Sequence, residues 1–253
     1  MHKFIYLFLV TACLFSCTQS PDSQPKKTAF AYGDHHSQKT LIDLDSTKGQ
    51  QLYQKIDKAK FAELKKYWIP QEKNYCGVCS IVIASNSLNG KKRLNQTTFF
   101  NEESSAILPA KIVSRMGLTL SELEANAKIH NPTRIVKKYN SLQTGSDKFR
   151  RFLIQNKKSD DIRIIVNFSR KSLAGTGMSS GHFSIVADYL PSEDLVLILE
   201  VNAERNHFWV KRRDLFNAML AVDPVSQIPR GWIIITEKTN RPVIKLRYRT
   251  SQQ

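Results

Sequence analysis

The sequence has few cysteines and, beyond its first residues, no long hydrophobic run. It contains 4 Cys in 253 residues, too few for the dense disulfide framework that holds small secreted domains together. No stretch reaches the about 20 apolar residues that a transmembrane helix needs, and no self-similar period indicates a repeat protein. These absences exclude a disulfide scaffold, a chain that spans a membrane by a helix, and a solenoid.

Acidic residues are also scarce relative to basic ones. The chain has 38 Lys+Arg against 22 Asp+Glu, a net charge of +16, and 41% hydrophobic residues. That hydrophobic share supports one sizeable folded core and argues against wholesale disorder. The basic clusters lack interleaved aromatic residues on which bases would stack, so we expect no nucleic-acid partner. The positive charge indicates solvated surfaces, or attraction to anionic lipids or to an anionic substrate.

The N-terminus has the features of an export signal. Positively charged residues 1–3 precede the apolar run 4–12, which is too short to span a membrane and matches a secretory signal. The run ends just before Cys17 in a segment that resembles a bacterial lipobox. We therefore expect residues 1–16 to be a lipoprotein signal peptide and Cys17 to be lipidated. Because residue 18 is Thr, we expect an envelope lipoprotein on the periplasmic face of the outer membrane. A cleaved signal with an incidental cysteine is the alternative.

Composition divides the remaining chain into three parts. Residues 17–45 are rich in Ser, Gln, Lys, Thr and Asp and predict a flexible tether. His35 and His36 within it have no third ligand nearby, so they predict no metal site. A folded domain is expected over 46–240 and a basic tail over 241–253.

Apolar periodicity predicts helices in the first half of the folded domain and strands in the second. Thr119 and Glu122 have the spacing of a capping box, which marks a helix start. Helices followed by a largely antiparallel sheet predict an α+β fold with a helical lobe and a β-sheet lobe. The expected helices span 53–66, 76–89, 121–128, 132–139, 146–156 and 211–220, and the expected strands span 162–168, 183–189, 195–201, 208–210 and 231–236.

Cys76 lies where a loop turns into the apolar helix predicted over 76–89. A thiol in the first helical turn faces unpaired backbone N–H groups and the positive end of the helix dipole, which favour the nucleophilic thiolate. Gln71, upstream, could donate its amide to a developing oxyanion. Two alternatives stay open: a buried structural cysteine, or a thiol–disulfide oxidoreductase that uses Cys76 and Cys79 as a Cys-x-x-Cys pair.

A glycine-rich loop ending at Gly181 places His182 at the first position of a predicted strand. The next strand carries Glu200 near its end, with Asn202 on the same face because side chains alternate along a strand. A carboxylate beside an imidazole holds its tautomer, although a packed histidine and a solvated carboxylate would also explain these residues singly. Together with Cys76 they follow the chain order of papain-like cysteine proteases.

Six short segments together resemble one known family. They span 75–77, 99–102, 117–123, 181–184, 197–201 and 223–232. These segments look like phytochelatin synthase, and the resemblance runs from about residue 65 to 237. The cysteine-rich C-terminal region of the plant enzymes is absent, so the chain resembles the short bacterial members, which mainly hydrolyse glutathione.

The resemblance implies a papain-like fold and a thiol-dependent γ-glutamylcysteine dipeptidyl transferase or peptidase. Such an enzyme cleaves the Cys–Gly bond of glutathione or a related γ-glutamyl thiol through a thioester, releases glycine, and passes the acyl group to water, glutathione or a phytochelatin. It implies no tightly bound cofactor, activation by cadmium or zinc through the substrate thiolate, and a homodimer. Two thiols without a dense His/Cys cluster predict no metal site in the protein. By position the resemblance implies Cys76 as nucleophile, His182 as general acid/base, Glu200 as orienting acid, Gln71 as oxyanion donor, and Asp223 and Arg230 as substrate-binding residues.

Three departures from the family pattern leave alternatives open. The family's acid is Asp, so Asn202 could act in place of the longer Glu200, as Asn does in papain. Gln71 lies five residues before Cys76, where the family has six. Cys79 replaces a small apolar residue, and its oxidation could switch off Cys76. A catalytically inactive lipoprotein that binds through its basic surface is the remaining alternative.

Overall fold

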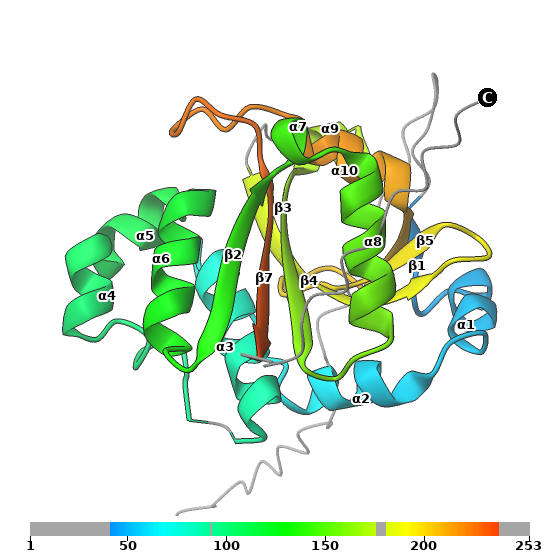
Figure 1. The fold of residues 1–253 in the computed structure, drawn as a ribbon, viewed down its shortest axis with the longest axis horizontal. Helices are drawn as coiled ribbons and strands as arrows, with labels where there is room; N and C mark the ends of the chain where they lie inside the picture. The colour runs from blue at the N-terminus through cyan, green and yellow to red at the C-terminus, as the bar shows by residue number, and fades with distance from the viewer. Residues whose placement is uncertain (1–40, 92, 176–180, 238–253) are drawn as a thin grey trace, which may run out of the picture.

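The computed structural model describes residues 41–91, 93–175 and 181–237 (Figure 1). The predicted signal peptide, Cys17 and the predicted C-terminal tail lie outside the described residues. Most of the predicted tether also lies outside them. Its last residues are described, and among them strand β1 (Ile42–Asp43) pairs with strand β6 (Phe208–Lys211). The folded domain therefore includes residues 41–45, which the sequence analysis assigned to the tether. No helix within the described ranges is long and apolar enough to cross a membrane.

A single seven-stranded sheet forms the centre of the described structure (Figure 1). Its strand order is β1-β6-β5-β4-β3-β7-β2, and every neighbouring pair is antiparallel. All five predicted strands are confirmed, with small shifts at their ends. Besides β1, the strands are β2 (Arg134–Asn140), β3 (Ile162–Ser169), β4 (Gly181–Leu190), β5 (Leu195–Leu199), β6 (Phe208–Lys211) and β7 (Gly231–Glu237).

Helices join the strands and cover the sheet, so the predicted α+β class is confirmed. Four of the six predicted helices are present, as α3, α6, α8 and α10. The capping box of α6 also forms, because the side chain of Thr119 accepts the N–H of Glu122 and the Glu122 carboxylate accepts the N–H of Thr119. The helices are α1 (Thr47–Tyr53), α2 (Lys58–Lys66), α3 (Cys76–Asn89), α4 (Glu102–Ile107), α5 (Ala110–Met116), α6 (Leu120–His130), α7 (Ser141–Thr144), α8 (Ser146–Lys157), α9 (Arg170–Ala174) and α10 (Arg212–Met219).

The helix predicted over 132–139 is wrong, because this segment forms strand β2. The strand pairs with β7 along its whole length, from Arg134 opposite Glu237 to Asn140 opposite Gly231. Its β-branched residues suit a strand, and β7 offers it a continuous hydrogen-bonding edge. Tertiary pairing therefore outweighed the local helical pattern.

The single helix predicted over 53–66 is also wrong, because two shorter helices share this region. Helix α1 ends at Tyr53, and α2 begins at Lys58. Asp57 lies between them as the N-cap of α2, where its carboxylate accepts the N–H of Ala59 at 3.0 Å. A capping residue with extended backbone starts a new helix and interrupts the previous one.

Helices lie on both faces of the sheet, and alternating side chains feed two hydrophobic cores. On one face, Ile165 and Ile185 pack in the core that contains α3. On the other, Ile164 and Val186 pack with residues of α8 and α10, which lie in front of the sheet in Figure 1. Because both faces are covered, the central strands have nearly continuous apolar sequences.

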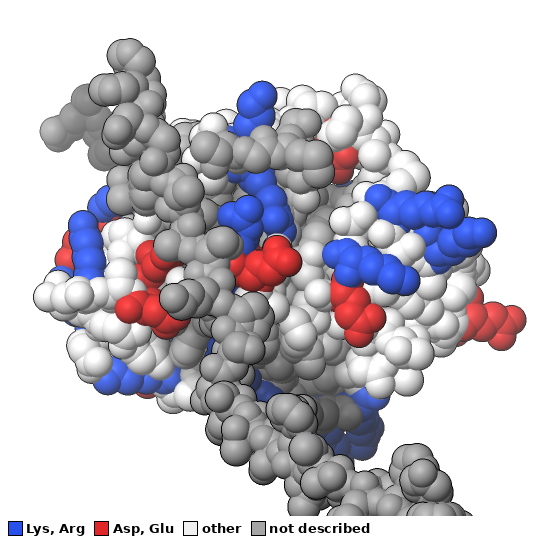
Figure 2. Space-filling model, turned by 180° about the vertical axis from the view of Figure 1, so that it is seen from behind, with Lys and Arg blue, Asp and Glu red and all other residues white. Residues whose placement is uncertain are grey.

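Charged side chains are mixed on one face of the molecule. In the view of Figure 2, the lysine and arginine side chains form separate groups, and acidic side chains lie between them. This face therefore does not present one continuous basic surface, although the net charge of the chain is +16.

Helix α3 approaches strand β4 closely at Gly77. A Cβ atom at this position would lie 2.9 Å from Cδ1 of Leu123 and 3.2 Å from Cδ2 of Phe183. Glycine thus lets the first turn of α3 pack against the beginning of β4. The close packing brings together the residues at these two ends, Cys76 and His182.

Candidate active site

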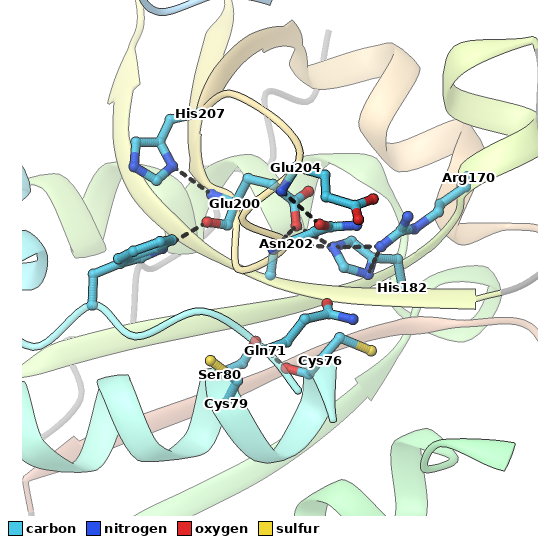
Figure 3. Close-up of polar contacts among 12 residues, drawn as sticks. Gln71, Cys76, Cys79, Ser80, Arg170, His182, Glu200, Asn202, Glu204 and His207 are labelled. Atoms are coloured by element: carbon cyan, nitrogen blue, oxygen red, sulfur yellow. Dashed lines mark hydrogen bonds and ion pairs between the residues drawn. The ribbon is translucent and has the colours of Figure 1, made fainter. Parts of the chain in front are cut away.

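Cys76 is the first residue of α3 and lines a cleft with a volume of about 760 Å³. The N-cap residue, Tyr75, makes no side-chain capping hydrogen bond. Cys76 itself is 9% exposed. His182 lines the same cleft, and its imidazole acts on the Cys76 thiol. Figure 3 shows the sulfur atoms of Cys76 and Cys79 turned away from each other. Only the first of these thiols therefore meets the imidazole.

The environment of Cys76 favours its thiolate. Burial raises the pKa of the Cys76 thiol, but the hydrogen bond and charge of His182 outweigh it, assisted by the backbone of Phe183 and the charge of Arg170. The net result is a lowered pKa. A thiolate beside an imidazolium is the nucleophilic form of a cysteine.

His182 and Glu200 form a buried pair on neighbouring strands. Nε2 of His182 donates to Oε1 of Glu200 at 2.6 Å, and both residues are buried. Burial lowers the pKa of His182, but the Glu200 carboxylate and the bond to Cys76 raise it above its usual value. Burial raises the pKa of Glu200, and the charge and hydrogen bond of His182 lower it to about 2. The carboxylate is therefore ionised and favours the imidazolium.

The acid that contacts His182 is Glu200, whereas Asn202 hydrogen-bonds to other groups. The backbone N–H of Asn202 donates to Oε1 of Glu200 at 2.8 Å, while its side-chain oxygen accepts the N–H of Glu204 at 2.9 Å. The backbone of Glu200 is also held, because its carbonyl accepts the indole N–H of Trp68 at 2.8 Å. The extra methylene of Glu200 is thus accommodated without moving the acid from the histidine.

Gln71 lies beside Cys76 in spite of its shorter spacing along the chain (Figure 3). Its backbone N–H donates to the carbonyl of Val201 at 2.8 Å, which ties the segment to the end of β5. Nε2 donates to the carbonyl of Lys73 at 3.0 Å, and an amide nitrogen carries a second N–H. Gln71 therefore shares the cleft with Cys76 and keeps one amide N–H beyond its bond to Lys73.

Asp223 and Arg230 line the same cleft. Nη1 of Arg230 donates to the carbonyls of Ala221 and Val222, at 3.1 and 2.7 Å. Its Nε is buried and has no hydrogen-bond partner within the described part of the chain. A Cβ at position 181 would lie 2.8 Å from this Nε, so Gly181 leaves the room that the guanidinium occupies. A buried cation and a buried carboxylate thus line the cleft that also contains the thiol.

Sequence reasoning missed Arg170, which follows directly after β3. Its Nη2 donates to Nδ1 of His182 at 2.6 Å. Since Nδ1 has one position for a proton, it accepts from Arg170 in the neutral imidazole and loses this bond when it is protonated. Only the pairing of β3 with β4 reveals it: Phe168 lies opposite His182, so residues just after β3 lie near the imidazole.

Cys79 has the opposite environment to Cys76. It is completely buried, and its Sγ donates to the carbonyl of Ile69 at 3.1 Å. Burial and the neighbouring Cys76 raise the pKa of the Cys79 thiol well above its usual value. This geometry does not favour the oxidoreductase alternative. Among the described residues, no group of three or more His, Cys, Asp or Glu could hold a metal ion.

Comparison with known proteins identifies the family of the chain. A profile of the phytochelatin synthase family matches residues 33–232. The chain is 28% identical over 211 residues to glutathione gamma-glutamylcysteinyltransferase 2 of Arabidopsis thaliana, covering 79% of this chain and 46% of that protein. It is 26% identical over 213 residues to glutathione gamma-glutamylcysteinyltransferase 3 of Lotus japonicus, covering 80% and 44%. The chain thus spans less than half the length of these relatives. The family profile covers most of the sequence, and the chain belongs to the phytochelatin synthase family.

Proposed function

We propose that this protein is a γ-glutamylcysteine dipeptidyl transferase or peptidase that acts on glutathione. The observation that carries the proposal is the contact of Cys76 with the buried His182–Glu200 pair inside a cleft. Family membership and the names of the relatives support the same activity. In this proposal Cys76 is the nucleophile, His182 the general acid/base and Glu200 the orienting acid.

The first half of the reaction releases glycine. The Cys76 thiolate attacks the carbonyl carbon of the Cys–Gly bond, and the electron pair of the C=O bond moves to its oxygen. Gln71 donates to this oxyanion, an interaction that stabilises the transition state more than the ground state. The imidazolium of His182 gives its proton to the glycine nitrogen as the C–N bond breaks. A γ-glutamylcysteinyl thioester then remains on Cys76.

The second half transfers the acyl group. Neutral His182 takes a proton from water, or from the amine of a second glutathione or a phytochelatin, as that nucleophile attacks the thioester. The Cys76 sulfur leaves as a thiolate and pairs again with the imidazolium. Water gives hydrolysis, and the amine gives a longer γ-glutamylcysteine chain.

Asp223 and Arg230 suit the γ-glutamyl end of the substrate. That end carries an α-ammonium and an α-carboxylate, and these two residues supply one charge of each sign in the cleft. A guanidinium donates parallel hydrogen bonds to a carboxylate. Cadmium or zinc acts in this proposal through the thiolate of the substrate, and the protein needs no tightly bound cofactor.

The test follows glycine and γ-glutamylcysteine by mass spectrometry after the purified, reduced protein is mixed with glutathione. We expect cleavage by the wild type and by Cys79→Ser, and none by Cys76→Ser, which serves as the matched comparison. Adding cadmium and measuring longer γ-glutamylcysteine chains separates transfer from hydrolysis. A folded wild type that releases no glycine would contradict the proposal and favour an inactive binding protein.

We also propose that the chain is exported and lipidated at Cys17, on the periplasmic face of the outer membrane, and that it forms a homodimer. The apolar run 4–12 follows a short basic segment, as in a secretory signal, and this pattern supports export. To test lipidation, cells are grown with labelled palmitate, which should be incorporated into the wild type and not into Cys17→Ala. To test the dimer, light scattering should give twice the mass of the chain. Label retained by Cys17→Ala would contradict lipidation, and a monomer mass would contradict the dimer.

A further inference from the structure

Gln71 is carried by an irregular segment between α2 and α3, so no helix or strand fixes its position. Side chains and backbone from elsewhere hold this segment at almost every residue. The contacts are Trp68 to the carbonyl of Glu200, Cys79 to the carbonyl of Ile69, and the Gln71 N–H to the carbonyl of Val201. The placement of the Gln71 amide therefore depends on how its backbone is held.

One buried side chain holds the residues on both sides of Gln71. Nε2 of Gln96 donates to the carbonyl of Pro70 at 2.9 Å, and its Oε1 accepts the N–H of Glu72 at 2.9 Å. Gln96 is buried, so its two hydrogen bonds are sheltered from competing water. A single amide thus holds the backbone immediately before and after the candidate oxyanion donor.

Gln96 is itself held in place by a tight turn. The side-chain oxygen of Asn95 accepts the N–H groups of Thr97 and Thr98, at 2.9 and 2.8 Å. Phe99 ends the turn and is completely buried. The turn is therefore a fixed support from which the Gln96 amide reaches the Gln71 segment.

We propose that Gln96 is a positioning residue for acyl transfer, which sets the Gln71 amide where the oxyanion forms. The inference rests on the proposed function for its natural substrate, but it concerns any acyl group that Cys76 attacks. A shift of about 1 Å in a group that acts in the transition state can cost about a hundredfold in rate. Loss of Gln96 should therefore lower kcat and leave KM largely unchanged, since the oxyanion is absent from the ground state.

The test compares Gln96→Ala and Gln96→Met with Gln71→Ala. Methionine keeps the volume of glutamine but removes both hydrogen bonds, so it separates positioning from packing. We expect both Gln96 variants to lower kcat for glycine release from glutathione by about tenfold to a hundredfold. The double variant Gln71→Ala/Gln96→Met should be no slower than Gln71→Ala within about twofold, because both changes affect one group.

Two further reactions of Cys76 separate an effect on the oxyanion from an effect on the thiol itself. Alkylation by iodoacetamide forms no oxyanion, so its rate should be unchanged in the Gln96 variants. Acylation by p-nitrophenyl acetate does form one, so its rate should fall together with kcat. Asn131→Ala is the matched control, because Asn131 is a buried amide that binds the carbonyl of Ala127 and the hydroxyl of Ser85. It should lose stability and keep wild-type kcat.

Several outcomes would overturn the inference. Wild-type kcat in Gln96→Met, an equal loss in the alkylation rate, or additive losses in the double variant would each show that Gln96 does not act through Gln71. If the wild type acylates with p-nitrophenyl acetate but releases no glycine from glutathione, the proposed function fails while the ester still tests Gln96. If the wild type is alkylated but never acylated, no working oxyanion donor exists, and the inference fails too.

Discussion

Cys76 and Cys79 lie one helical turn apart on α3, and their surroundings differ in almost every respect. The first lines the cleft, and His182 lowers its thiol pKa in spite of the burial that raises it. The second is fully buried, donates to a backbone carbonyl, and has a pKa that burial raises further. The pKa values of two identical residues in one motif thus move in opposite directions.

The difference shows that the start of a helix does not by itself make a thiol reactive. Both cysteines lie in the first turns of α3, where the dipole favours an anion. Only Cys76 also meets an imidazole, that of His182, because Gly77 lets α3 approach the beginning of β4. The tertiary contact decides which thiol is the nucleophile.

The largest expected effect is the difference in reactivity between the two thiols. At pH 7, iodoacetamide should alkylate Cys76 at least about a hundredfold faster than Cys79, because the thiolate is the reacting form and Cys79 is inaccessible. Peptide mapping by mass spectrometry after timed quenching measures both rates in one sample. Comparable labelling of the two residues in folded protein would remove the basis of the comparison.

The next effect comes from the carboxylate behind the histidine. Burial lowers the pKa of His182 and Glu200 raises it, so Glu200→Gln should lower it. The thiolate–imidazolium pair is then lost at a lower pH, so the alkaline limb of the kcat/KM profile should move to lower pH. We expect kcat to fall by about a hundredfold or more. Asn202→Ala, whose side chain does not contact His182, is the comparison, and an equal loss there would contradict the assignment to Glu200.

A smaller effect is expected at Arg170. Burial, Glu200 and Cys76 have larger effects on the pKa of His182. The charge of Arg170 adds a smaller one that lowers this pKa, and it also lowers the pKa of Cys76. Arg170→Met should therefore raise both pKa values and move both limbs of the pH–rate profile to higher pH. A change of about one unit would alter the rate on the acid limb by about tenfold. If only one limb moves, Arg170 acts on one of the two groups alone.

The smallest effect is expected at Cys79. Cys79→Ala removes the hydrogen bond to the carbonyl of Ile69, which should cost about 1 kcal/mol in the free energy of unfolding. Urea unfolding measures this loss, and kcat should stay within about threefold of the wild type. A much larger loss of kcat with stability intact would mean that Cys79 takes part in the chemistry.

Local patterns in the sequence predicted a large part of the fold. The strands of the second half are continuous apolar runs, and α3 is an apolar segment closed by Gly90, which adopts a left-handed backbone. The helix predicted over 132–139 was wrong, because the local pattern also fits a helix and only the edge of β7 makes residues 134–140 a strand. The break between α1 and α2 was missed, because it depends on a single cap at Asp57.

The site was predicted in the same uneven way. Cys76, His182 and Glu200 could be named because each carries a reactive group at a recognisable place in a helix or strand. Arg170 and Gln96 carry no such signal, since an arginine after a strand and a glutamine in a turn are common on solvated surfaces. Their contacts exist only once β3 pairs with β4 and the turn at residues 95–99 packs against the Gln71 segment.

The sequence by itself determined the chemical groups, their order along the chain and the α+β class, because these depend on residue type and short-range periodicity. Only the tertiary structure decided which acid contacts His182, which cysteine meets the imidazole and what holds Gln71. These outcomes depend on distances between segments far apart in the chain, and on burial, which changes the free energy of every charge in the cleft.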